Sequence, residues 1–197
     1  MKKFFAFFLF TVLFFSNSNT SFSIEPDVFI QSTVNKASQI LSENISKEEK
    51  INELKIVAKE TVDIRGVGFY SLGSARKNLN NNEKKIYFDL FENYFLKSFS
   101  SRLSEYTNPK IEVQSKKIIN KNYTIVNSVL VSTPDRPEVK IDWRVYTKNP
   151  NDPLIRDLII EGLSLARTQK EEFASILNSN NNDINALFKT LKDFAKN

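Results

Sequence analysis

The chain of 197 residues contains no cysteine, no histidine and only four glycines. Without cysteine no disulfide can form, so the core must be stable by itself. Without either residue, the Ser-His and Cys-His pairs that activate nucleophiles are excluded, and so are imidazole-based zinc and copper sites. Carboxylate-based hydrolysis and calcium binding remain open, although the sequence has no Asp-x-Asp-x-Asp-Gly loop of the calcium-binding type.

The first residues have the pattern of an export signal. Two lysines precede an apolar run from Phe4 to Phe15, which suits the core of a signal peptide and is short for a membrane span. Small polar residues follow, with a plausible cleavage site after Ser23. We expect residues 1–23 to be a cleaved signal peptide and residues 24–197 to form one exported domain. An uncleaved anchor is the alternative.

The charge of the chain is mild and evenly distributed. The formal net charge is +5, and the basic residues are scattered among acidic ones. Nucleic-acid binding is therefore not expected. After the N-terminal run, no segment is apolar enough to suggest a second membrane-spanning helix.

The first half of the domain has helical spacing. A helix is expected from Pro26, and a second after Ser46, which together with Glu49 forms the sequence pattern of a capping box. The next segment, Asp63 to Gly73, holds three of the four glycines. It lacks a preceding strand and a Gly-Lys-Ser/Thr sequence, so it is not a phosphate loop. It is either a tight turn between closely packed helices or the mouth of an apolar cavity.

A long helix with many aromatic residues is expected from Glu83 to Tyr106. Its apolar residues extend well beyond the arc of about 100° that a surface helix needs. The helix is therefore either a central helix covered on two sides or the wall of an apolar chamber, because aromatic rings are large and stiff.

The pattern then changes to strands and back to helices. Four strands are expected, over Lys110–Ile119, Asn122–Ser132, Glu138–Thr147 and Leu154–Glu161. Helices follow over Ser164–Asn178 and Ile184–Ala195. The predicted fold class is α+β, with N-terminal helices, a four-stranded antiparallel twisted sheet and C-terminal helices. Such a sheet facing an aromatic helix can enclose an apolar cavity.

Five short sequence features occur in an order that resembles one exported family. They are Val62-Asp63, Leu72-Gly73 with the following Tyr87-Phe88 and Phe91, Tyr106, Arg136-Pro137-x-Val139 before Trp143, and Asp157 with Glu161-Gly162-Leu163-Ser164, Gln169 and Phe173. Together they resemble the MlaC, or toluene-tolerance auxiliary, family. Two departures are Pro153, where the family usually has Trp, and Thr168-Gln169, where it often has Tyr-Arg.

The resemblance implies a periplasmic phospholipid carrier rather than an enzyme. Members of the family carry a diacyl phospholipid between the outer and inner membranes and thereby maintain outer-membrane lipid asymmetry. The implied partners are an inner-membrane ABC transporter with MCE domains and an outer-membrane complex of a lipoprotein with a porin. No cofactor is implied, and a monomer is expected because a shuttle must diffuse.

Twelve apolar residues are the candidates for the lipid-binding surface, although each of them could instead be packed core. They are Val67, Tyr70, Leu72, Phe91, Phe95, Phe99, Ile141, Trp143, Val145, Leu158, Ile160 and Leu163. Leu163→Glu is expected to abolish lipid retention.

Two other functions remain open. One is a periplasmic adaptor that binds a partner peptide in an apolar groove. The other is a carboxylate-based hydrolase, for which Asp63, Asp157 and Glu161 are the candidate groups.

Overall fold

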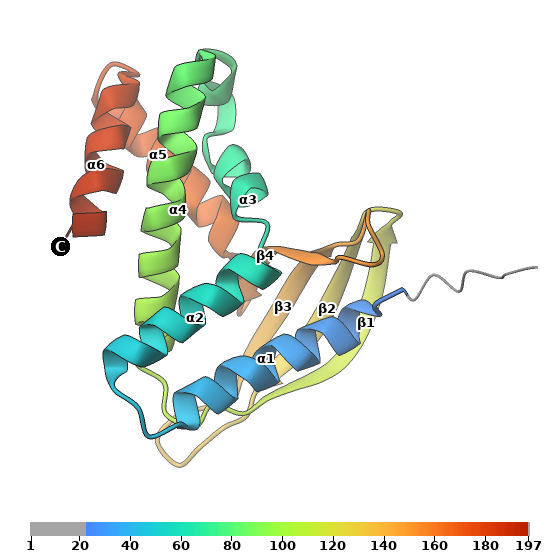
Figure 1. The fold of residues 1–197 in the computed structure, drawn as a ribbon. Coiled ribbons are helices and arrows are strands. Elements are labelled where there is room, and N and C mark those ends of the chain that lie inside the picture. Colours follow the sequence, from blue (N-terminus) through green and yellow to red (C-terminus); the bar gives the residue numbers. More distant parts are fainter. Residues whose placement is uncertain (1–22, 197) are drawn as a thin grey trace, which may run out of the picture.

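A computed structural model describes residues 23–196 and has the expected α+β arrangement (Figure 1). The predicted signal peptide, apart from Ser23, lies outside the described residues. Helices precede and follow a single antiparallel sheet. The helices are α1 (Pro26–Ser42), α2 (Lys47–Thr61), α3 (Ile64–Ser71), the short 3-10 helix η1 (Gly73–Lys77), α4 (Asn81–Leu103), α5 (Leu165–Ser179) and α6 (Ile184–Lys196).

Capping residues define where the helices start. The predicted capping box of α2 is confirmed, since the Ser46 side chain accepts from the N–H of Glu49 and the Glu49 carboxylate accepts from the N–H of Ser46. The same reciprocal pair, made by Asn80 and Glu83, begins α4. Each box satisfies backbone donors that a helix start would otherwise leave unpaired.

Most of the glycine-rich segment after Asp63 is a helix, so its prediction as a tight turn was wrong. Asp63 caps α3 by accepting from the N–H of Gly66 at 2.8 Å. A Cβ at Gly66 would collide with the Asp63 carboxylate, and a Cβ at Gly68 would lie 2.7 Å from the Phe91 ring. These two glycines therefore allow close approach inside and beside the helix.

The sheet contains the four expected strands and one short addition. The strands are β1 (Ile111–Asn120), β2 (Tyr123–Leu130), β3 (Val139–Tyr146), β4 (Leu154–Ile160) and β5 (Leu163–Ser164), hydrogen-bonded in that order and antiparallel throughout. The two-residue β5 pairs with the end of β4 just before α5 begins. The sequence pattern did not predict this strand and placed Ser164 at the start of the following helix.

Two buried clusters lie on either side of an intervening space. The sheet core joins α1 to the sheet and contains Ile30, Val34, Val126, Leu130, Ile141, Trp143, Val145 and Ile155. The helical core joins α3, α4, α5 and α6 and contains Val67, Leu72, Leu79, Tyr87, Phe91, Ala166, Phe173, Leu177, Leu187 and Leu191. Figure 1 shows α1 lying across the sheet while α4, α5 and α6 stand apart as a second group. The candidate site lies between the two groups.

Candidate functional site

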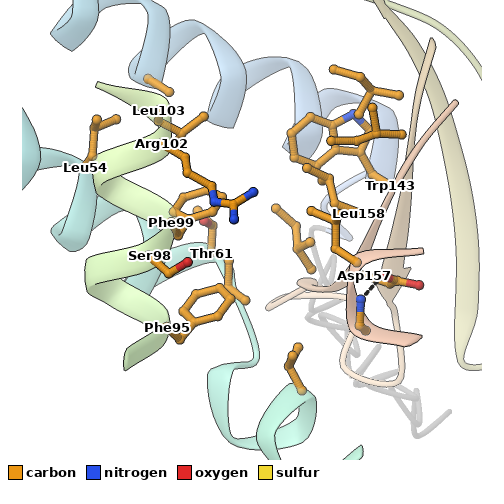
Figure 2. Close-up of a pocket in the computed structure, with 18 of the residues that line it drawn as sticks. Leu54, Thr61, Phe95, Ser98, Phe99, Arg102, Leu103, Trp143, Asp157 and Leu158 are labelled. Carbon is orange, nitrogen blue, oxygen red and sulfur yellow. Dashed lines mark hydrogen bonds between the residues drawn. The ribbon is translucent and has the colours of Figure 1, made fainter. Parts of the chain in front are cut away.

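A cavity of about 500 Å³ separates α4 from the sheet and is partly open to solvent. Its walls come from helices α1 to α6 and strands β1 to β4, and most of the surface is apolar. Pockets for small molecules commonly have volumes of roughly 300–1,000 Å³, so this one has the size of a ligand site. Figure 2 shows side chains of α4 facing those of the sheet across this space.

The wall formed by α4 is a row of aromatic rings. Phe91, Phe95 and Phe99 follow one another at every fourth position and all line the cavity. The Phe91 and Phe95 ring centroids are 6.1 Å apart, and those of Phe95 and Phe99 are 5.6 Å apart with nearly parallel planes. Such stacking supports each ring, so the row can border a void without collapsing into it.

The opposite wall is the inner face of the sheet. Trp143 of β3 and Leu158 of β4 are paired in register, and both line the cavity. The indole Nε1 of Trp143 donates to Ser128 Oγ at 2.9 Å, and that hydroxyl donates to the carbonyl of Ile141 at 3.0 Å. The polar atom of the ring is thus satisfied within the sheet.

Two charged residues at the cavity boundary hold the neighbouring helices in place. Arg156 binds the carboxylate of Asp63, with Nη2 and Nε at 2.6 and 2.7 Å from Oδ2. The carboxylate of the buried Asp157 accepts from the Ser164 hydroxyl at 2.6 Å. It also accepts from the N–H of Ala166 at 3.0 Å, the bond drawn as a dashed line in Figure 2. The first contact ties β4 to the start of α3, and the second ties it to the start of α5.

Tyr94 forms a polar contact between α4 and α5 at the edge of the cavity. Its hydroxyl donates to Gln169 Oε1 at 2.8 Å. Burial raises the pKa of Tyr94 above its usual value, and the charge of Glu172 adds to this effect. The phenol is therefore a neutral donor at neutral pH.

A model of the MlaC protein family matches residues 31–193. The chain belongs to the MlaC family. The resemblance inferred from the sequence is thereby confirmed, and the match spans most of the described domain. No curated protein matches the chain.

Among solved structures, the fold is similar to that of a phospholipid-binding protein from Ralstonia solanacearum, determined in complex with a phospholipid at 1.53 Å. The two chains are 16% identical, with a TM-score of 0.73 over 88% of this chain and 98% of the other. At this identity the likeness establishes a shared fold.

Eight of the twelve residues predicted for the site line the cavity. They are Val67, Phe91, Phe95, Phe99, Ile141, Trp143, Leu158 and Ile160. They come from α3, α4 and strands β3 and β4, so the structure brings three separate parts of the chain together. Whether these side chains contact a lipid stays a prediction.

The other four predicted residues do not line this cavity. Leu72 is buried in the helical core, and Val145 is fully buried in the sheet core, which α1 covers. Tyr70 is on the outer surface of α3, with the Lys170 ammonium 5.3 Å from its ring centroid. Leu163 is 59% exposed in the short strand β5 and does not line the cavity, although its strand partner Ile160 does.

The sequence pattern did not identify the part of the wall that α1, α2 and the adjoining Val62 supply. These lining residues are Thr33, Val34, Ala37, Ser38, Leu41, Leu54, Val57, Thr61 and Val62. Their helical spacing was visible, but it indicates only that one face of each helix is covered. Nothing in that spacing distinguishes a packed neighbour from a cavity.

The three carboxylates considered for a hydrolase all have structural contacts. Asp63 caps α3 and binds Arg156, and Asp157 anchors the start of α5. The Glu161 carboxylate accepts from the N–H of Lys140. Among residues 23–196, no group of three or more potential metal ligands comes together, and no helix is long and apolar enough to cross a membrane.

Proposed function

We propose that this protein is a periplasmic carrier that holds the acyl chains of a diacyl phospholipid in the cavity and moves the lipid between the outer and inner membranes. This transport would maintain the lipid asymmetry of the outer membrane. The observation that carries the proposal is the apolar cavity between the aromatic row of α4 and the sheet. Membership of the MlaC family and the phospholipid found in the similar Ralstonia protein support it.

The physical reason is the cost of exposing acyl chains to water. Each methylene group that leaves an apolar environment costs about 0.8 kcal/mol, so two long chains cannot cross an aqueous compartment unprotected. A wall of rings facing aliphatic and indole side chains supplies a replacement for the bilayer interior. Holding a lipid in this way needs no cofactor and no bond-making step.

The proposed partners follow from the family. They are an inner-membrane ABC transporter with MCE domains and an outer-membrane complex of a lipoprotein with a porin. We further propose that the eight lining residues from the predicted set contact the acyl chains and that the protein acts as a monomer in the periplasm after cleavage following Ser23.

Vesicle-to-vesicle transfer tests this function. Donor vesicles carrying a tail-labelled phospholipid are mixed with unlabelled acceptor vesicles, with and without the protein. We expect the protein to accelerate transfer, and Phe99→Glu to reduce the acceleration at least tenfold, because a carboxylate in the ring wall is incompatible with dry acyl chains.

The structure replaces the sequence-based expectation for Leu163→Glu, because Leu163 is exposed and does not line the cavity. This variant becomes the matched control, since it places the same charge outside the cavity. It should transfer lipid as the parent does. A parent protein without any effect on transfer would contradict the proposed function. Equal losses in the two variants would show that the cavity is not where the lipid binds.

A further inference from the structure

The cavity wall formed by α4 carries a second row of residues, which is polar. Tyr94, Ser98 and Arg102 follow one another at every fourth position of α4, Tyr106 lies three residues beyond the end of that helix, and all four line the cavity. Tyr94, Ser98 and Arg102 lie three positions after Phe91, Phe95 and Phe99 respectively, so the polar row runs beside the apolar row along α4. The wall is thus divided lengthwise into an apolar and a polar strip.

The C-terminal end of the polar row lies at the exposed margin of this wall, whereas Tyr94 and Ser98 are half-buried. Arg102 and Tyr106 are exposed, whereas Phe95 and Phe99 in the neighbouring row are half-buried and Phe91 is almost completely buried. A ligand whose apolar part lies along the rings would therefore have its polar part beside this margin.

Arg102 differs from the other charged residues that line the cavity. Arg156, Asp157 and Glu172 each have a hydrogen-bonding partner in the protein. Within residues 23–196, the guanidinium of Arg102 has neither a hydrogen bond nor an ion pair. No hydrogen bond or ion pair within the described residues therefore neutralises this guanidinium.

The direction of this side chain is visible in Figure 2. The guanidinium extends from α4 into the space that faces Trp143 and Leu158, with Phe99 on the same face of the helix. Its charge also acts on the neighbouring polar row, because it lowers the pKa of Tyr94 against the larger raising effect of burial. An unpaired cation at the edge of an apolar cavity is a site for an anion.

We propose that Arg102 binds the phosphodiester of the bound phospholipid, with the hydroxyls of Ser98 and Tyr106 as neighbouring donors. This inference rests on the proposed function and names the group that the site recognises. A guanidinium presents its donors in a planar fork that matches two phosphate oxygens. Phosphate at the polar row would direct the acyl chains along Phe95 and Phe99.

The consequence is selectivity for a class of lipid. Because the phosphodiester is common to phospholipids, the contact favours phospholipids over uncharged diacylglycerols rather than one head group over another. The apolar row, in contrast, contacts chains that both classes share. Removing the cation should therefore affect one class and spare the other.

The test compares two short-chain lipids below the concentrations at which they aggregate, dihexanoyl phosphatidylglycerol and dihexanoylglycerol. Binding is followed by the fluorescence of Trp143, which is the chain's only tryptophan and lines the cavity. Arg102→Gln should weaken binding of the phosphatidylglycerol about fivefold to tenfold, as expected for a partly exposed charged hydrogen bond, and leave the diacylglycerol Kd unchanged. Arg102→Lys should retain part of the parent's affinity for the phosphatidylglycerol, because it keeps the charge but not the planar fork of donors.

Arg76→Gln is the control for a general change in net charge. Its guanidinium lies 5.0 Å from the centroid of the exposed Phe69 ring, outside the cavity, and this variant should bind both lipids as the parent does. Added salt should weaken the parent's phosphatidylglycerol binding more than that of Arg102→Gln.

Two outcomes would overturn the inference while leaving the carrier function intact. Equal losses for both lipids would mean that Arg102 only shapes the wall, and unchanged binding of both would mean that the phosphate lies elsewhere. If the parent binds neither short-chain lipid and also fails to transfer lipid between vesicles, the proposed function is wrong and the inference falls with it.

Discussion

The two halves of α4 have similar aromatic sequences but opposite surroundings. In the N-terminal half, Tyr87 and Phe91 are 0% and 1% exposed, and the ring of Phe173 from α5 packs edge-on against both at 6.5 and 6.1 Å. Phe91 marks the transition between the halves, because this buried ring also lines the cavity. In the C-terminal half, Phe95 and Phe99 stack on each other and border the cavity. A phenylalanine on this helix becomes core or cavity wall according to what faces it, and its spacing is the same in both cases.

The difference arises from the elements opposite each half. The N-terminal half is covered by α3 and α5, and Tyr87 fixes the approach of α3 by donating its hydroxyl to the carbonyl of Gly68 at 2.9 Å. The C-terminal half faces the sheet across the cavity. The comparison predicts that stability depends mainly on the first half and ligand binding mainly on the second.

The largest effect on stability is expected from Phe173→Ala. This ring is 1% exposed and packs on Tyr87 and Phe91 in the N-terminal half. Its removal should lower the free energy of unfolding by about 3–5 kcal/mol, because a buried Phe→Ala change loses apolar burial and leaves a cavity. Urea unfolding measures the change. A loss below about 1 kcal/mol would show that the helical core is loosely packed.

A smaller loss is expected from Gly68→Ala. The added Cβ would lie 2.7 Å from the Phe91 ring, so α3 or the ring has to shift. Overpacking of this kind costs about 1–3 kcal/mol. In the double variant with Phe91→Leu, the total loss of stability should be smaller than the sum of the two single-variant losses, which a double-mutant cycle detects. Simple additivity would mean that the two positions are not in contact.

The smallest loss is expected from Phe99→Ala in the C-terminal half. The ring already borders a void and mainly stacks on Phe95, so its removal should cost about 0.5–1.5 kcal/mol without ligand. Retention of lipid should nevertheless fall, whereas a substitution in the packed core would mainly lower stability. A loss as large as that of Phe173→Ala would remove the distinction between the two halves.

Most of the fold was predictable because its signals are local. The period of the apolar residues identified the helices and the four long strands, and Ser46 with Glu49 identified the start of α2. The helix α3 was missed because three glycines in one short segment favour a turn. Gly68 instead lets α3 pack closely against Phe91. This contact joins positions 23 residues apart, so local spacing does not reveal it.

The site was less predictable because it depends on where packing stops. Trp143 and Val145 occupy the same face of β3, yet the first lines the cavity and the second is enclosed in the sheet core. Alternation along a strand identifies the covered face and not the element that covers each position. Arg102 was overlooked for a similar reason, since its lack of a partner becomes evident only when the neighbouring helices and strands are in place.

The most direct test of the account is the mass of the exported protein, purified without detergent and weighed by native mass spectrometry. The account predicts a species heavier than the polypeptide by one phospholipid, which organic extraction then releases and identifies. A protein that is purified empty and remains empty after incubation with phospholipid vesicles would contradict it.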